Sequence, residues 1–546
     1  MISRPGPTLR EIGVASVGFS ILTVALTYPQ AVQLSSHVGF HYDALFSIWR
    51  LTWIAHQLLV DPMHLFDANI FYPALNTLAF SDAVLLPSLV AAPAIWAGAP
   101  PVVIYNLLVL LSFVTAGVAM YFFVRSINLP KVAAAFAGAA FAFNAYRFAH
   151  FPQLELLWTC WIPLALWSFH RATATRRARD GALLGLFVAC QALSCLYYAV
   201  FPVTRLIVLS CVSALQLSWR ELRDMWKPAV AAAIVSILLV APYAIPYTKG
   251  ARAFGERTIE EVRNWSPPLA SYMGAPESNW WYDKPREGLD PVEKALFPGL
   301  VIVVLAVVGV ISRPRKYAVP YAILGVVAFD LSLGVNGMTY RYLFDTVWLY
   351  RGLRVPGRMF VMVSAGLSVL AAIGLTRVAT WPRWGPRAAL ALLVFSVVEA
   401  VSIPLPTEPI PPPASKVDLW LAQQPRVPIA EWPWPRSDAL GFTRAPIYMY
   451  RSIRHWQPLV NGYSGNYTEG YIVFLDATRD FPARAAVRHM QDMGVRYVIL
   501  HSQPDPARFV DVVRRIAHQP ALQFQFAENT GDEEIAVYLL RPDGAQ

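Results

Sequence analysis

A long series of apolar segments constrains this sequence more than any other feature. These segments fall at 11–29, 102–124, 132–149, 155–170, 181–198, 199–217, 228–246, 297–312, 317–334, 359–376 and 387–404. A helix that crosses a bilayer needs about 20 mostly apolar residues. Only 15% of the 546 residues are charged and the mean hydropathy is +0.42, values that exclude a soluble protein of this length. We therefore expect a mainly α-helical, polytopic transmembrane bundle of about 11 spans.

The connectors between these segments indicate the orientation of the chain. Basic residues gather before the first segment and in every second connector, at Arg4, Arg10, Arg125, Lys131, Arg171, Arg176, Arg177, Arg179, Arg220, Arg223, Lys227, Arg313, Arg315, Lys316, Arg377, Arg383 and Arg387. Cytoplasmic loops carry an excess of Lys and Arg, so the N-terminus and these connectors are predicted to be cytoplasmic. The same rule accounts for the net charge of +10 without nucleic-acid binding.

The remaining connectors are then predicted to face the periplasm. The apolar run 83–98 is short and carries two prolines, and counting it as a crossing would reverse every later connector. We therefore expect it to be re-entrant or to lie along the outer interface. The outer segments are long and rich in aromatic and charged residues, which indicates that the protein works on its outer face.

The tail beyond the last apolar segment is predicted to be a separate domain. The stretch PLPTEPIPPP resembles a stiff, extended linker. Beyond it, strands are expected at 426–434, 495–502, 524–529 and 534–541, and helices at 482–493 and 505–517. We therefore divide the chain into a transmembrane domain 1–404 with a first outer loop 30–101, a linker 405–426, and a small extracytoplasmic α/β domain 427–546 that serves as a lid, docking or stabilising element.

Asp43 is the first candidate for chemistry. It lies in the first outer loop, soon after the first apolar segment, among four histidines that include His41. A carboxylate at the membrane boundary is costly and usually functional or paired, so Asp43 is a candidate general base or a neighbour of a metal ion, with His41 in substrate binding. The alternative is that Asp43 is the N-cap of the helix that begins there.

A second cluster lies at the predicted outer turn 144–155. Arg147, His150 and Glu155 bracket a proline at this turn. An arginine and a histidine beside a carboxylate can bind a phosphate and shape proton transfer. The alternative is structural: Arg147 reaches toward lipid head groups and His150 caps a helix end.

A third cluster is the pattern R-G-L-R-V-P-G-R at 351–358. It contains Arg354 and Arg358 and lies on the predicted outer side, where an excess of arginine is unexpected. Guanidinium groups suit phosphate through bidentate geometry, and in a transfer reaction they would stabilise the leaving phosphate. The alternative is simple binding of lipid head groups.

Several stretches together resemble a known family. They are HYDALFSIW around Asp43, NIFYP, VRSINLP, RFAHFPQLELLWTCWIPLAL, ALFPGLVIVV, LRVPGRMFVM and MGVRYVILH. The chain resembles the GT-C superfamily of integral-membrane glycosyltransferases that use polyprenyl-phosphate sugars, and is closest to bacterial YfhO-like members. The resemblance implies an inverting hexosyl or pentosyl transfer on the outer face, with Asp43 as base or metal neighbour. Many members carry two adjacent acidic residues here, whereas Tyr42 and Ala44 flank Asp43. The lack of a second acidic neighbour favours a metal-free mechanism. Use of a divalent cation, Mg²⁺ or Mn²⁺, is the open alternative.

Together with this resemblance, the sequence predicts a glycosyltransferase of the bacterial inner membrane with Asp43 as catalytic base. Its expected partners are a polyprenyl-phosphate-linked sugar donor, membrane lipids, and a polysaccharide, lipid or protein acceptor. The alternative is a non-catalytic carrier or assembly protein for envelope polysaccharide or lipid-linked sugar. A carrier needs ionisable groups along a path through the membrane, and Arg205 is the main candidate deep in a span.

Overall fold

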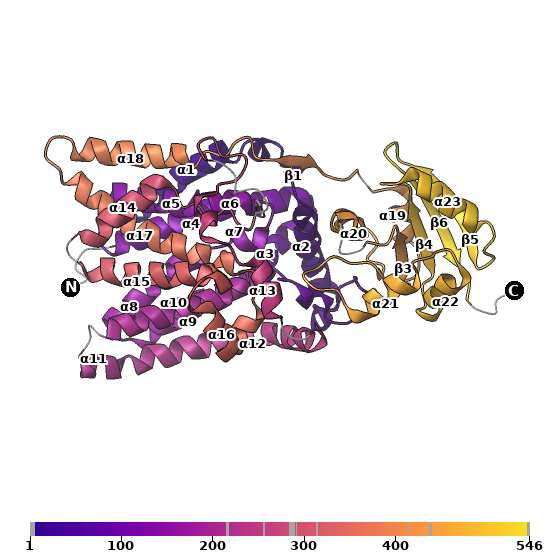
Figure 1. Cartoon of the computed structure of the whole chain (residues 1–546), viewed down its shortest axis with the longest axis horizontal. Helices are drawn as coiled ribbons and strands as arrows, with labels where there is room; N and C mark the ends of the chain where they lie inside the picture. The colour runs from indigo at the N-terminus through magenta and orange to yellow at the C-terminus, as the bar shows by residue number, and fades with distance from the viewer. Residues whose placement is uncertain are drawn as a thin grey trace. The chain divides into compact units, whose positions relative to one another are not determined.

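The computed structural model describes residues 6–542 except 215–217, 255–256, 283–289, 291, 313–314, 413 and 436–438, and omits the side chains of 202–203, 205, 211, 213–214, 251–254, 315 and 439–442 (Figure 1). The chain forms two compact units. The first comprises 1–39, 103–244 and 256–407, and the second comprises 40–102, 245–255 and 408–546. Residues 40–102, most of the predicted first outer loop, therefore cluster with the C-terminal residues.

The first unit is a helical bundle. Its main helices are α1 (Leu9–Leu26), α4 (Pro101–Ser126), α5 (Lys131–Ala142), α8 (Trp161–Thr175), α9 (Ala178–Ser194), α10 (Tyr197–Ala214), α12 (Trp226–Phe254), α14 (Leu300–Ile311), α15 (Arg315–Ser332), α17 (Phe360–Ala379) and α18 (Gly385–Glu399). Short helices connect them: α6 (Ala145–Ala149), α7 (Leu154–Leu157), α11 (Trp219–Asp224), α13 (Ile259–Trp265), α16 (Tyr340–Thr346) and η7 (Pro356–Met359). Figure 1 shows the long helices of this unit running nearly parallel.

Helices occupy every apolar segment that the sequence predicts to span the membrane. Among the described residues, five helical stretches are long and apolar enough to cross a bilayer: Leu9–Leu26, Pro101–Ser126, Lys131–Ala149, Trp219–Gly250 and Pro356–Ala379. The protein is thus a multi-pass membrane protein. The number of about 11 spans and the cytoplasmic N-terminus remain predictions from the sequence.

Helix α17 is the centre of the bundle. It packs against α5, α14, α15 and α18, and nearly all of its residues are buried. At Gly374 and Gly309 helices α17 and α14 nearly touch, because a Cβ on either glycine would lie 2.0 Å from a backbone oxygen of the other helix. The outer helices differ: only 17% of the apolar window of α1 is buried. Apolar side chains exposed along such helices are suited to contact with lipid.

The second unit joins two helices of the first outer loop to a small α/β fold. Its helices are α2 (Asp43–Val60), α3 (Leu85–Trp96), α19 (Lys416–Leu421), α20 (Ala439–Ser452), α21 (Glu469–Ala477), α22 (Arg484–Asp492) and α23 (Pro506–Ile516). The four-stranded sheet has the order β3 (Ile429–Trp432), β4 (Tyr497–His501), β6 (Glu534–Leu540) and β5 (Leu522–Asn529), with β3 and β4 parallel and the other pairs antiparallel. Two short strands, β1 (His37–Gly39) and β2 (Thr407–Pro409), lie where the chain passes between units. Each strand and helix that the sequence predicts in the tail coincides with one of these elements.

An aromatic face of α2 connects the loop to the C-terminal fold. Phe46, Trp49 and Trp53 follow a helical spacing, are buried, and stack in series, and α2 packs against α20. Trp53 also contacts Trp456 edge-to-face, with ring centroids 5.5 Å apart. Asn69 accepts a hydrogen bond from the indole of Trp49 and donates to the carbonyl of Gln457. These contacts give the unit one continuous core built from distant parts of the sequence.

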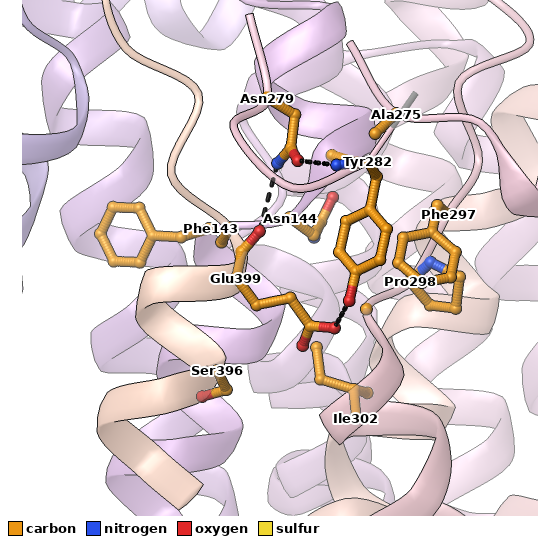
Figure 2. A pocket seen from close by; sticks show the side chains of 13 residues that line it. Phe143, Asn144, Ala275, Asn279, Tyr282, Phe297, Pro298, Ile302, Ser396 and Glu399 are labelled. Carbon is orange, nitrogen blue, oxygen red and sulfur yellow. Dashed lines mark hydrogen bonds between the residues drawn. The ribbon is translucent and has the colours of Figure 1, made fainter. Parts of the chain in front are cut away.

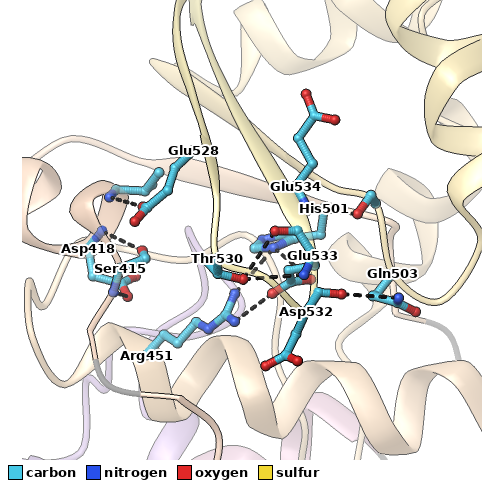
Figure 3. Close-up of polar contacts among 12 residues, drawn as sticks. Ser415, Asp418, Arg451, His501, Gln503, Glu528, Thr530, Asp532, Glu533 and Glu534 are labelled. Carbon is cyan, nitrogen blue, oxygen red and sulfur yellow. Dashed lines mark hydrogen bonds and ion pairs between the residues drawn. The ribbon is translucent and has the colours of Figure 1, made fainter.

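A buried charge network lies beside the sheet (Figure 3). His501 at the end of β4 lies 2.7 Å from a carboxylate oxygen of Glu431 on β3. Arg451 on α20 donates to Glu533 at 2.5 Å, and Glu533 lies 3.6 Å from His501. The ring of Tyr448 stacks on His501. Because buried charges are costly unless paired, this network ties α20 to β3, to β4 and to the residue that precedes β6.

Candidate functional site

Asp43 is the first residue of α2, and its carboxylate is held by side chains. The N-cap position of α2 is Tyr42, which makes no side-chain cap hydrogen bond, so the alternative role of Asp43 as an N-cap does not match the structure. Asp43 is 9% exposed. Its Oδ1 accepts a hydrogen bond from the phenol of Tyr463 at 2.8 Å, and its Oδ2 lies 3.2 Å from Nδ1 of His41. A carboxylate at the start of a helix also benefits from the helix dipole.

His41 lies between two carboxylates in the second unit. Its Nδ1 lies 3.2 Å from both the backbone amide nitrogen and Oδ2 of Asp43, so a ring protonated at Nδ1 donates to the carboxylate. Glu408 accepts a hydrogen bond from the backbone of His41. Burial raises the pKa of Glu408, and the contact with His41 offsets only part of that effect. The sequence analysis missed Glu408, because it lies in the predicted linker with no local signal for a site.

In the first unit, His150 and Arg358 converge on Glu293. Arg358 donates from Nη2 to Oε1 of Glu293 at 2.6 Å, and Nε2 of His150 lies 3.1 Å from Oε2. Burial by itself would raise the pKa of Glu293, but Arg358 and His150 outweigh it and hold this pKa well below its ordinary value. Glu293 lies in the predicted outer loop 247–296, and its neighbours in sequence give no sign of its role.

His150 is fully buried, with 0% of its surface exposed. Its Nδ1 lies 2.8 Å from the carbonyl oxygen of Tyr146, and its Nε2 faces Glu293. Both ring nitrogens therefore face oxygen acceptors. His150 and Arg358 both contact the carboxylate of Glu293. For His150, this fits a role in positioning Glu293 more closely than direct contact with a ligand.

Arg147 has a different environment from the one predicted. It is 2% exposed, and its guanidinium donates to the carbonyl oxygen of Leu157 at 2.9 Å and to the hydroxyl of Thr159 at 2.7 Å. It also lies over the ring of Phe113. These contacts hold the turn after α7 against α6, and burial keeps Arg147 from reaching lipid head groups. Glu155, on α7, is likewise buried.

Arg354 is the arginine of its loop best placed to take an anion. Its guanidinium lies 5.2 Å above the ring of Trp265, and its backbone amide donates to the hydroxyl of Tyr197. Within the described part of the chain, this guanidinium makes no hydrogen bond or ion pair. Arg351 instead donates to backbone carbonyls, and Arg358 is paired with Glu293. Arg354 thus presents a half-exposed cation supported by an aromatic ring.

The predicted site residues fall into two groups, one in each unit. Asp43 and His41 belong to the second unit, and Arg147, His150, Glu155, Arg354 and Arg358 belong to the first. Among the described residues, no three or more His, Cys, Asp or Glu side chains are grouped so that they could hold a metal ion.

A pocket in the first unit has a structural role (Figure 2). It is small and is lined by Asn144, Asn279, Tyr282 and Glu399 among others. The phenol of Tyr282 points at the carboxylate of Glu399, which also accepts hydrogen bonds from the first backbone amides of α14. The side chain of Asn279 donates to the backbone oxygen of Glu399. These polar groups form hydrogen bonds with one another, and Glu399 holds the start of α14 through its first backbone amides.

No family model and no curated protein matches the sequence. Solved structures do match. The arabinofuranosyltransferase AftD from Mycobacteria aligns over 99% of this chain and 40% of its own, with 14% identity and a TM-score of 0.68. The oligosaccharyltransferase AglB from Archaeoglobus fulgidus aligns over 96% of this chain and 74% of its own, with 12% identity and a TM-score of 0.52. Both are membrane glycosyltransferases of the GT-C superfamily.

This chain has a GT-C fold. The resemblance predicted from the sequence is thereby confirmed for the fold, since the likeness to AftD extends over 99% of the chain. The chain spans 40% of the length of AftD. Within this GT-C fold, one group of predicted site residues contains Asp43 and His41 in the second unit, and the other contains Arg354 and Arg358 in the first.

Proposed function

We propose that this protein is a membrane glycosyltransferase that moves a sugar from a polyprenyl-phosphate donor to an acceptor hydroxyl on the periplasmic face, with inversion. The observation that carries the proposal is the environment of Asp43. Its carboxylate is buried at the start of α2 and held by the phenol of Tyr463 and the imidazole of His41, rather than used as a helix cap. A carboxylate fixed in this way is suited to accept a proton from a hydroxyl.

The chemistry assigns one role to each group. Asp43 removes the proton of the acceptor hydroxyl while that oxygen attacks the anomeric carbon. The bond between this carbon and the phosphate oxygen breaks, and the phosphate leaves with its electron pair on the lipid. Arg354 stabilises the charge of the departing phosphate. Arg358, four residues further on, is held by Glu293, which also contacts His150.

Apolar side chains near the basic loop are suited to a lipid-linked donor. They line a very small gap between α10, α15 and the start of α17, and they include Leu324, Leu331 and Met359. Met359 directly follows Arg358, so apolar surface and basic side chains adjoin in the first unit. AglB has been solved with a dolichol-phosphate, which combines the same two chemistries in one ligand.

The test is a transfer assay with the full-length protein in detergent or vesicles. A panel of polyprenyl-phosphate hexoses and pentoses is offered with polysaccharide, lipid and peptide acceptors, each with EDTA, Mg²⁺ or Mn²⁺. We expect Asp43→Asn to lose roughly 10²- to 10⁴-fold in kcat, the usual contribution of a general base. Asp61→Asn is the matched control, because Asp61 lies in the same loop, is half exposed and pairs with His64; its activity should equal wild type. Equal activity of Asp43→Asn and wild type would remove Asp43 from this role.

The same assay separates the enzyme from a non-catalytic carrier. A carrier would bind and move lipid-linked sugars without forming a glycosidic product in any combination of donor and acceptor. The side chain of Arg205, the candidate for a path through the membrane, lies outside the described residues.

A further inference from the structure

We propose that Tyr463 is a positioning residue for Asp43, so that the segment after the linker forms part of the catalytic site. The inference rests on the proposed function and deepens it. The phenol of Tyr463 donates a 2.8 Å hydrogen bond to Oδ1 of Asp43 across 420 residues of sequence. Both residues belong to the second unit.

The ring of Tyr463 is fixed by the residues that flank Asp43. It packs edge-to-face on Tyr42, with ring centroids 5.4 Å apart, and on Phe46, with centroids 5.2 Å apart. Such aromatic contacts favour specific orientations and add about 0.5–1.5 kcal/mol each beyond burial. The phenol therefore points at the carboxylate because its ring is wedged between two side chains of the same short stretch.

The backbone that carries Tyr463 is anchored to the loop as well. Phe71 donates from its amide to the carbonyl of Asn461 at 3.1 Å, and Tyr72 donates to the carbonyl of Leu459 at 2.9 Å. Gly462, next to Tyr463, packs so closely that a Cβ would lie 2.7 Å from the ring of Phe71. The first outer loop and residues 459–463 are thus joined by backbone hydrogen bonds and close packing.

The chemistry of the pair favours positioning over proton transfer by Tyr463. Burial raises the pKa of Tyr463 well above its ordinary value, and the neighbouring Asp43 raises it further. The phenol therefore stays protonated and can only donate. A hydrogen bond donated to a carboxylate stabilises its ionised form. It also fixes the orientation of the carboxylate, whose Oδ2 lies on the side of His41.

The experiment compares Tyr463→Phe with Asp43→Asn, the double variant and wild type in the transfer assay. The phenylalanine keeps the ring and its packing and removes only the hydroxyl. We expect kcat to fall roughly 10- to 100-fold, as for a misplaced catalytic group, with the KM of the donor unchanged. The acidic limb of the pH–kcat profile should move to higher pH, because the base loses the donor that stabilises its ionised form.

Tyr471→Phe is the matched control. It removes another buried phenol hydrogen bond of the second unit, 2.6 Å to the carbonyl of Pro435, without touching Asp43. Its kcat and pH profile should match wild type. In the double variant, the loss caused by Tyr463→Phe should disappear, because the phenol acts only through the carboxylate.

Two outcomes overturn the inference in distinguishable ways. In the first, Asp43→Asn loses activity but Tyr463→Phe keeps the wild-type kcat and pH profile, or the loss caused by Tyr463→Phe persists in the Asp43→Asn background. Tyr463 then has no positioning role, and the proposed function stands. If Asp43→Asn is as active as wild type, the proposed function fails and the inference fails with it.

Discussion

Arg358 donates to Oε1 of Glu293 at 2.6 Å. This ion pair distinguishes Arg358 from Arg354, the other candidate phosphate ligand of the loop 351–358. The carboxylate of Glu293 largely offsets the positive charge of Arg358, so the pair attracts a phosphate only weakly. The loop pattern R-G-L-R-V-P-G-R predicts two equivalent phosphate ligands, whereas the structure distinguishes them. Arg358 is held by Glu293 and His150, and Arg354 keeps its charge over Trp265.

Glu293→Gln is expected to destabilise the first unit. The side chains of Arg358 and Glu293 are only 12% and 8% exposed, and removal of one partner of a buried pair costs about 3–5 kcal/mol. The melting temperature in detergent should fall accordingly. Glu261→Gln is the control, because its pair with Arg257 is more exposed and should cost about 1 kcal/mol or less. Equal melting temperatures for the two variants would contradict this role of the buried pair.

Arg354→Ala should weaken binding of the lipid-linked donor. Loss of a hydrogen bond to a charged group costs about 1.5–3 kcal/mol, which corresponds to roughly a 10- to 150-fold rise in KM for a polyprenyl-phosphate sugar. Arg354→Lys should recover only part of this, since an ammonium lacks the planar fork. Arg341→Ala, which removes an exposed arginine paired with Asp345, should leave KM unchanged. An equal effect of both alanine variants would indicate general attraction of the lipid rather than a site at Arg354.

Gly374→Ala should disturb the centre of the bundle. Its Cβ would lie 2.0 Å from the backbone oxygen of Leu305, so α17 and α14 must separate. Overpacking of this kind costs about 1–3 kcal/mol, to be read from thermal unfolding. Gly325→Ala on α15 is the matched control, because its Cβ would meet nothing within 4 Å, and alanine there should be neutral or favour the helix by about 0.5–1 kcal/mol. Similar losses in both variants would contradict a close crossing of α14 and α17.

The charge network of the second unit predicts a pH dependence of stability. Burial opposes both ionised groups, but His501 and Arg451 lower the pKa of Glu533 from 4.5 to about 2, and Glu431 and Glu533 raise the pKa of His501 above 6.5. Glu533 therefore contributes stability above about pH 4.5, which is lost as the pH falls toward 2. His501 contributes stability below about pH 6.5, which is lost as the pH rises through its raised pKa.

His501→Gln tests the second half of this dependence. The difference in melting temperature between wild type and the variant should be largest near pH 5–6 and should shrink in alkaline buffer. His518→Gln removes a histidine of the same unit whose environment is exposed, and its melting temperature should follow wild type at each pH. A difference for His501→Gln that stays constant from acidic to alkaline pH would show that His501 contributes by packing alone.

Local pattern was sufficient for the helices and strands but not for the partners of charged residues. The apolar run 359–376 predicts α17, and the β-branched run at 495–502 predicts β4, because periodicity acts over a few residues. Arg147, His150 and Glu155 are close in sequence and suggest one cluster. In the structure Arg147 is bonded to a turn, whereas His150 pairs with Glu293 across 143 residues. No spacing rule could have found Glu293.

The sequence by itself determined a multi-pass helical protein, the four strands and two of the helices of the C-terminal fold, and Asp43 as the residue to test. Hydropathy, turn residues and isolated charges are local properties, whereas α19, α20 and α21 were not predicted. Tertiary structure alone decided that Tyr463 holds Asp43, that Glu293 takes up Arg358 and that residues 40–102 share a unit with the C-terminal fold. The physical reason is that a buried charge takes the partner that folding brings within about 3 Å, and chain topology, not distance along the sequence, sets that partner.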